Sequence, residues 1–211
     1  MVRIVLVDDH GIVRDGLKLL LSAESDLCIV GEAGSGAEAV TWAAREDWDL
    51  ALLDVNLPDM NGLEVLRQLR GSGCSRPVLI LTMYRDFHLA RRLMQSGANG
   101  FIDKSRLAAE LLRAIRVVVG GELFLTDELR DQFTQSAIHH EVSHPHDRLS
   151  AQEFQILLLI ARGYTVSRIS EELKLSPSTV TTYRRRIKEK LAIQGSTAEM
   201  VRYAVEHGLL V

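Results

Sequence analysis

The run Arg3-Ile4-Val5-Leu6-Val7 ends directly on Asp8-Asp9. A short aliphatic run that ends on a polar residue recurs as Leu50-Ala51-Leu52-Leu53 before Asp54, Pro77-Val78-Leu79-Ile80-Leu81 before Thr82, and Gly100-Phe101-Ile102-Asp103 before Lys104. Such runs, separated by stretches with helical spacing, are typical of buried parallel strands that alternate with helices. Because the carboxyl ends of parallel strands line one edge of a sheet, three carboxylates, a hydroxyl and an ammonium are expected to meet there.

Length and composition are those of an ordinary globular chain. Its 211 residues, 46% hydrophobic and 25% charged, suffice for one large or two modest domains. The two cysteines, Cys28 and Cys74, lie in dissimilar contexts and are expected to be free thiols. The sequence has neither a signal peptide pattern nor an apolar stretch of membrane-spanning length, so we expect a cytoplasmic protein with no membrane partner.

The net charge of −3 is unevenly distributed along the chain. Residues 147–211 hold 10 Lys and Arg against 7 Asp and Glu, whereas the preceding residues hold 15 against 21. A basic C-terminal part that follows an acidic N-terminal part suggests that only the C-terminal part meets a polyanion.

Residues 1–121 are divided by turn residues into alternating strands and helices. A fifth strand is expected near residues 27–31, and helices are expected at 12–22, 36–46, 63–70, 87–95 and 107–119. This alternation predicts an α/β domain with a doubly wound, five-stranded parallel sheet.

Residues 122–147 are predicted to form a linker with one helix. Thr126 suits the N-cap of a helix that extends to about Ser136. Residues 137–146 contain four histidines and little apolar periodicity, and we interpret them as an exposed tether. A metal site is the alternative, although these histidines lack a typical ligand spacing.

Residues 148–211 are predicted to be all-α. Ser150 and Glu153 form a capping box for a helix at 151–162, and three further helices follow at 166–173, 178–191 and 197–207. The third helix starts with hydroxyl side chains and continues with three arginines. This pattern suits a helix that reads the major groove of DNA, and a solvated basic face is the alternative. The residues expected at this interface are Arg168, Ser178, Thr179, Thr181, Thr182, Tyr183, Arg184, Arg185, Arg186 and Lys188.

The polar residues at the sheet edge suit phosphoryl chemistry. Asp8, Asp9 and Asp54 would repel one another without a cation, and their oxygen atoms favour Mg²⁺. Asp54 stands alone after its strand, as expected of a carboxylate nucleophile that forms an acyl phosphate. Lys104 and Thr82 can bind phosphoryl oxygens. The alternative is that the three aspartates only cap the turns that follow them.

Four motifs resemble the receiver domain of two-component response regulators. They are Val7-Asp8-Asp9-His10, Leu53-Asp54-Val55-Asn56-Leu57-Pro58-Asp59-Met60-Asn61-Gly62, Leu81-Thr82 and Gly97-Ala98-Asn99-Gly100-Phe101-Ile102-Asp103-Lys104. The resemblance implies that residues 1–121 are a receiver whose Asp54 is phosphorylated by a sensor histidine kinase.

The same resemblance implies roles for other residues of the receiver. Asp9, Asp54 and the backbone carbonyl of Asn56 would bind Mg²⁺ directly, and Asp8 would act through water. Thr82 and Phe101 match the switch pair, in which the hydroxyl moves toward the phosphoryl group and the ring turns inward. For Phe101, a plain core aromatic is the alternative.

Residues 148–211 resemble the LuxR-type helix-turn-helix domain of the NarL/FixJ family. The matching segments are Leu149-Ser150-Ala151-Gln152-Glu153, Ile160-Ala161-Arg162-Gly163, Ile169-Ser170, Leu175-Ser176, Ser178-Thr179-Val180, Lys190-Leu191 and Gly208-Leu209-Leu210. The resemblance implies a four-helix domain that binds double-stranded DNA and dimerises through its last helix, for which packing onto the recognition helix is the alternative. Thr181 and Tyr183 replace the usual Lys and His, as in regulators of the GacA and BvgA type.

These features predict a homodimeric transcription regulator in which phosphorylation of Asp54 controls DNA binding. One alternative is a phosphorylation-independent DNA-binding regulator with a vestigial receiver. The other is a phosphatase with an aspartyl-phosphate intermediate, but such enzymes usually carry a second acid where this chain has Asn56. We therefore do not expect an enzyme.

Overall fold

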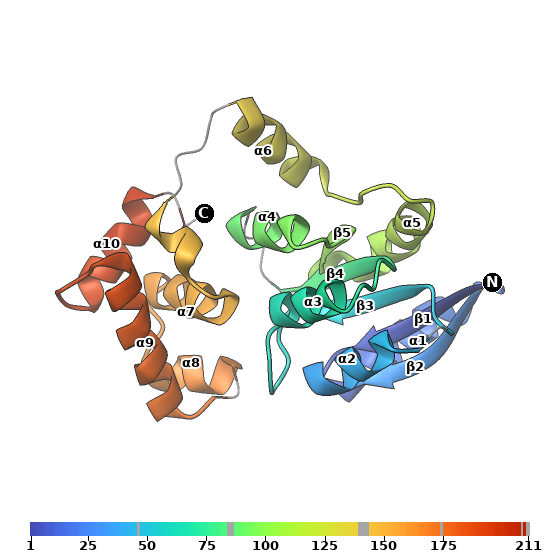
Figure 1. Cartoon of the computed structure of the whole chain (residues 1–211), viewed down its shortest axis with the longest axis horizontal. Helices are drawn as coiled ribbons and strands as arrows, with labels where there is room; N and C mark the ends of the chain where they lie inside the picture. The colour runs from blue at the N-terminus through green and yellow to red at the C-terminus, as the bar shows by residue number, and fades with distance from the viewer. Residues whose placement is uncertain (46, 84–86, 139–143, 174, 208, 210–211) are drawn as a thin grey trace. The chain divides into compact units, whose positions relative to one another are not determined.

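The computed structural model describes residues 1–45, 47–83, 87–138, 144–173, 175–207 and 209. The chain divides into two compact units, Met1–Gln135 and Ser136–Val211. Figure 1 shows the strands in the first unit and the helices α7 to α10 in the second.

The first unit contains a parallel sheet with the strand order β2-β1-β3-β4-β5. Its strands are β1 (Val2–Val7), β2 (Leu27–Ala33), β3 (Leu50–Asp54), β4 (Val78–Thr82) and β5 (Gly100–Asp103). Its connecting helices are α1 (Gly11–Leu21), α2 (Gly36–Ala43), α3 (Gly62–Gly71), α4 (Phe87–Gln95), the 3₁₀ turn η1 (Lys104–Arg106) and α5 (Leu107–Val119). The predicted doubly wound fold is confirmed, and its strand order reverses between β1 and β3, where such sheets bind ligands.

Successive residues of β1 face opposite sides of the sheet. Ile4 and Leu6 belong to the core cluster that contains buried residues of α1 and α5. Val5 and Val7 line a small apolar pocket together with residues of α2 and α3. The period of two in a strand therefore places these two pairs of helices on opposite faces.

The predicted helices of this unit agree with the observed ones to within a few residues. The helices expected at 87–95 and 107–119 have these bounds. The helix expected at 36–46 is shorter, because α2 ends at Ala43, and Glu46 lies outside the described residues.

Phe124 returns the chain to the sheet after α5. It forms a parallel bridge with Gly100, the N–H of Phe101 donates to its carbonyl at 3.1 Å, and its own N–H donates to the carbonyl of Asn99 at 3.0 Å. A Cβ at Gly100 would lie 2.7 Å from Cδ1 of Leu79 and 3.0 Å from the Cβ of Phe124, so glycine leaves the room that this close approach needs. The backbone around Phe124 thus covers part of the outer edge of β5.

Helix α6 (Asp127–Ile138) contacts the first unit through residues of its first two turns. Phe133 packs edge-on against Phe87 at the start of α4, with ring centroids 5.0 Å apart. Glu128 lies 3.6 Å from Arg106 of η1, and Leu129 is buried. The sequence predicts this helix as part of a linker, whereas the compact first unit extends through most of it, to Gln135.

The second unit contains η2 (Pro145–Arg148) and the helices α7 (Ala151–Ala161), α8 (Val166–Leu173), α9 (Pro177–Leu191) and α10 (Thr197–Glu206). Helix α7 packs against each of the other three helices, and its residues 154–160 are all buried. The predicted capping box is confirmed: the Ser150 side chain accepts from the N–H of Glu153, and the Glu153 carboxylate accepts from the N–H of Ser150. The all-α prediction is therefore confirmed as well.

The prediction of an exposed tether over residues 137–146 is wrong at its C-terminal end. His146 belongs to η2 and is 1% exposed, with its Nδ1 3.0 Å from the hydroxyl of Tyr203. Its ring also lies beside those of Phe154 and His207. Aromatic side chains from α7 and α10 bury this imidazole, and local composition does not reveal such a contact. His139 and His140 lie outside the described residues.

Within the described ranges, no helix combines the length and hydropathy that crossing a bilayer requires. Both cysteines are free thiols and half-buried.

Candidate functional site

The carboxyl edge of the sheet brings the predicted polar residues together. Asp54 and Thr82 are the last residues of β3 and β4, and Asp8 follows β1. These strands are neighbours, since β3 pairs with both β1 and β4. Asp8, Asp54 and Thr82 are each at most 2% exposed, so the edge holds buried polar groups that need partners.

Lys104 joins two of the carboxylates. Its Nζ lies 2.6 Å from Oδ2 of Asp8 and 2.9 Å from Oδ2 of Asp54. Asp103 fixes the turn at this point, because its carboxylate accepts a hydrogen bond from the N–H of Ser105 at 2.8 Å. Burial disfavours the ammonium charge, but Asp54 and Asp8 outweigh this effect and raise the pKa of Lys104.

Asp54 is ionised at an energetic cost. Desolvation raises its pKa to about 6; the Lys104 charge acts against this shift, and the Asp8 charge adds to it. A hydrogen bond from the N–H of Asn56 also favours the carboxylate form. One ammonium therefore does not compensate for the burial of these acids, and a further cation would stabilise the ionised site.

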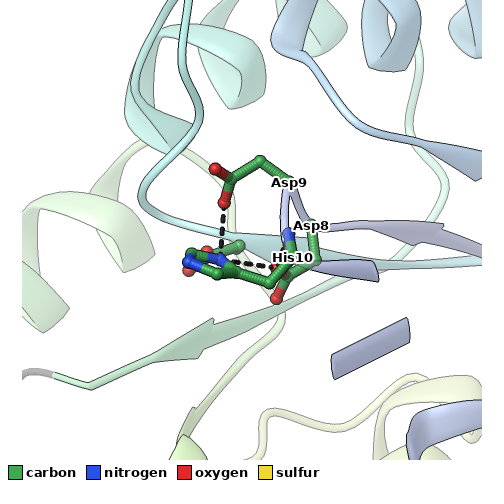
Figure 2. Close-up of side chains that lie close together, drawn as sticks. Asp8, Asp9 and His10 are labelled. Carbon is green, nitrogen blue, oxygen red and sulfur yellow. Dashed lines mark hydrogen bonds and ion pairs between the residues drawn. The ribbon is translucent and has the colours of Figure 1, made fainter. Parts of the chain in front are cut away.

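Asp9 and His10 complete the cluster (Figure 2). The Nδ1 atom of His10 lies 2.7 Å from Oδ1 of Asp9 and 3.3 Å from Oδ1 of Asp8. Asp8, Asp9, His10 and Asp54 each offer a potential metal-ligand atom, and these atoms all lie within 4.8 Å of one another. His10 is not among the site residues expected from the sequence, although its place directly after the aspartate pair is a signal that could identify it.

The loop after Asp54 is held by α2 and α3. Asp59 accepts hydrogen bonds from the N–H groups of Gly36 and Ala37, at 2.7 and 2.8 Å, at the start of α2. A Cβ at Gly62 would lie 2.7 Å from the carbonyl oxygen of Asp54, so only glycine fits this close approach. The loop that carries Asn56 is thus fixed against both helices.

Thr82 and Phe101 lie on neighbouring strands. Thr82 is opposite Asp103 in the β4–β5 register, and Phe101 precedes Asp103 by two residues. The Phe101 ring is 2% exposed. A buried ring suits a switch residue that has turned inward as well as a plain core aromatic, so both interpretations of Phe101 remain.

Helix α9 presents most of the residues expected at a nucleic-acid interface. Ser176 caps it by accepting from the N–H of Thr179 at 3.1 Å, and Pro177 is its first residue. The residues on its exposed surface are Ser178, Thr181, Thr182, Arg185 and Arg186. Thr179 and Tyr183 are half-buried.

Two of the expected interface residues bind within their own unit instead of pointing away from it. Nη2 of Arg184 donates to Oγ1 of Thr197 at 2.5 Å, and Nζ of Lys188 donates to the carbonyl of Gly195 at 2.6 Å. Both contacts fix the turn between α9 and α10. On α8, Arg168 stacks over the ring of Tyr164 at 3.8 Å.

Two family models match the chain. Residues 4–116 match "Response regulator receiver domain", and residues 147–204 match "Bacterial regulatory proteins, luxR family". The chain is 37% identical over 210 residues to "Response regulator UvrY" of Escherichia coli K12, covering 99% of this chain and 96% of that one. It is 38% identical over 211 residues to "Response regulator GacA" of Pseudomonas viridiflava, covering 100% and 98%. The chain belongs to the LuxR-type response regulators.

A solved structure agrees with the fold of this response regulator. RcsB of Salmonella enterica serovar Typhimurium, bound to the promoter rprA with the phosphomimetic BeF₃⁻, matches with a TM-score of 0.63 at 19% identity. The match covers 97% of this chain and 99% of that one. The family consists of two-component regulators that bind DNA to control transcription, and it is not a family of known enzymes.

Proposed function

We propose that this regulator accepts a phosphoryl group on Asp54 and that the acyl phosphate controls how its second unit binds DNA. The observation that carries this proposal is the contact of Lys104 with both Asp8 and Asp54 inside a buried carboxylate cluster. A capping role for the aspartates would not require an ammonium between them.

Phosphoryl transfer to Asp54 follows from the chemistry of these groups. A carboxylate oxygen of Asp54 attacks the phosphorus of a phosphohistidine on the sensor kinase, the P–N bond breaks, and its electron pair stays on the imidazole, which takes up a proton. Lys104 lies beside Asp54 and can stabilise the charge on the transferred oxygens as an ammonium donor. Thr82 supplies a hydroxyl at the same edge.

The oxygen donors present suit Mg²⁺. We assign Asp9, Asp54 and the backbone carbonyl of Asn56 as its direct ligands, with Asp8 acting through water. The bound ion would neutralise charge on the phosphoryl oxygens. This assignment is supported by the close approach of carboxylate oxygens from Asp8, Asp9 and Asp54.

Phosphorylation would be read through Thr82, Phe101 and the helices next to them. Movement of Thr82 toward the phosphoryl group would bias α4 and α5 between two arrangements. Helix α6 contacts α4 and η1, so it is suited to pass this change on to the second unit.

The second unit would bind double-stranded DNA through α9 and form a homodimer through α10. One small helical module makes few phosphate contacts, so a dimer is needed for tight binding. We propose Arg168, Ser178, Thr179, Thr181, Thr182, Tyr183, Arg185 and Arg186 as DNA-facing residues, with Arg184 and Lys188 also fixing the α9–α10 turn. We further propose a cytoplasmic protein with a receiver at 1–121, a linker at 122–147 and a DNA-binding domain at 148–211.

Treatment with acetyl phosphate and a divalent cation tests this function. The wild-type protein is expected to gain the mass of one phosphoryl group and to bind operator DNA more tightly, whereas Asp54→Asn gains neither. Mass spectrometry and fluorescence anisotropy provide the two measurements. Equal DNA affinity with and without the phosphoryl group would favour the vestigial-receiver alternative.

A further inference from the structure

His10 directs a nitrogen atom into the carboxylate cluster. Figure 2 shows its imidazole beside Asp8 and Asp9, with Nδ1 at 3.3 Å and 2.7 Å from their Oδ1 atoms. Adjacent ligands of an octahedral ion with bonds of about 2.1 Å lie about 3 Å apart. The distance from Nδ1 to Oδ1 of Asp9, the carboxylate assigned above as a direct ligand, is therefore close to that between adjacent ligands of one ion.

The backbone holds His10 in this place. Its N–H donates to Oδ1 of Asp8 at 2.8 Å, and it has extended dihedral angles (φ −91°, ψ 108°) immediately before α1. Arg14 fixes the preceding segment by donating to the carbonyl of Asp8 at 2.6 Å. The imidazole is 48% exposed, so a cation can reach it from solvent.

The charge of the cluster suits a divalent ion with a neutral imidazole ligand. Three carboxylates and the Lys104 ammonium leave two negative charges, which one divalent cation balances. Imidazole is a good ligand for divalent first-row transition ions, whereas Mg²⁺ is bound mainly by oxygen atoms. A nitrogen at this position would therefore change which ion the site prefers.

We propose that His10 is a direct ligand of the cation site and that it gives this regulator a preference for a divalent transition ion over Mg²⁺. The inference rests on the cation site proposed above and adds a ligand and an ion class to it.

Cation binding to the full-length protein tests the proposal, with Mn²⁺ as the probe and Mg²⁺ as the competitor. Free Mn²⁺ is measured by electron paramagnetic resonance in wild type, His10→Ala and the control His144→Ala, whose histidine belongs to the second unit. We expect His10→Ala to lower Mn²⁺ affinity by about tenfold or more and Mg²⁺ affinity by less than about twofold. The control should leave both affinities unchanged.

Spin-echo modulation by ¹⁴N provides a readout independent of affinity. Mn²⁺ bound to wild type should show the modulation of a directly coordinated imidazole, and His10→Ala should remove it. Modulation that persists in His10→Ala would assign the nitrogen to another histidine and overturn the proposal. An equal loss of Mn²⁺ and Mg²⁺ affinity would also overturn it, because His10 would then only orient Asp9.

Failure of the role proposed for His10 can be distinguished from failure of the proposed cation site. If wild type binds Mg²⁺ and Mn²⁺ without any dependence on His10, only the role of His10 is wrong. If wild type binds neither ion, the proposed cation site itself is wrong.

Discussion

Asp54 is almost fully buried at a sheet edge, and desolvation together with Asp8 raises its pKa to about 6 despite Lys104. In an unfolded chain the value is near 3.8. The folded state therefore disfavours the carboxylate, so the free energy of unfolding of the cation-free protein falls as pH rises from about 4 to about 6. Above about pH 6 the folded protein bears the full free-energy cost of ionising Asp54. The residue suited to accept a phosphoryl group is thus one that destabilises the fold.

Asp54→Asn should stabilise the cation-free protein at pH 7 by about 1 to 3 kcal/mol, because the amide removes the cost of burying a charge. The gain should shrink as pH falls toward 4. Urea denaturation in the presence of a chelator, repeated at several pH values, measures it.

Asp49→Asn provides the control of opposite sign. Its hydrogen bonds with Arg3 lower the pKa of Asp49 to about 2 despite desolvation. This stabilisation is fully present above about pH 4 and is lost as pH falls toward 2. Asp49→Asn should therefore lose stability at pH 7, and a gain in both variants would contradict the explanation for Asp54.

Helix α9 carries basic residues in two different environments, one exposed to solvent and one bonded within the unit. Arg185 lies on the exposed surface, whereas Arg184 donates to Thr197 across the turn to α10. Position along the helix therefore separates a solvent-exposed charge, which we propose contacts DNA, from one that is held within the unit.

Arg185→Ala should weaken DNA binding by about 1 to 3 kcal/mol with little change in thermal stability. Arg184→Ala should instead lower the melting temperature of the second unit, because Thr197 loses its donor. Fluorescence anisotropy and circular dichroism measure the two effects. The interpretation fails if both variants lose DNA affinity equally at unchanged stability.

Helix α6 contacts α4 through the Phe133 ring, which packs edge-on against Phe87. Phe133→Ala should remove about 0.5 to 1.5 kcal/mol of this contact. We expect faster hydrogen exchange in α6, with exchange in the sheet unchanged. The exposed Thr134→Ala is the matched control, and similar exchange in both variants would show that Phe133 does not hold the helix.

Regular elements and the sheet-edge cluster are predictable from this sequence because they follow from local periodicity and from strand ends. The aliphatic runs ending on Asp8, Asp54 and Thr82 predict both the sheet and the meeting point of its polar residues. The burial of His146 and the attachment of Phe133 are not predictable in this way, since each depends on a side chain distant in sequence or on another element. The proximity of His10 to Asp9 depends on how the chain turns into α1, which composition does not encode.

At the scale of the whole molecule, each unit has its own core and an ion pair in which the carboxylate is buried. In the second unit, Glu153 is 3% exposed, accepts from the N–H of Ser150 and lies 2.6 Å from Nζ of Lys190. Burial would raise the pKa of Glu153, but Lys190 and Ser150 outweigh it and lower the value. This pair therefore stabilises the unit above the ordinary Glu pKa and is lost as pH falls below it.

Glu153→Gln should lower the stability of the second unit by roughly 1 to 3 kcal/mol, because Lys190 and the start of α7 lose a charged partner. Phosphorylation of Asp54 by acetyl phosphate should keep its rate, since the first unit has a separate core. Calorimetry and phosphoryl incorporation measure the two properties. A slower rate in the variant would show that the units are coupled in stability.

The backbone bonds of Phe124 to Asn99 and Phe101 have a consequence for assembly. Another chain cannot add a strand to the sheet at this point of β5, because the N–H of Phe101 and the carbonyl of Asn99 are already bonded to Phe124. Copies of the protein that associate at this point would do so through side chains and not by backbone pairing. Such associations can form and dissociate with the lifetime of a chemical signal, whereas continuous intermolecular sheets tend to grow into aggregates.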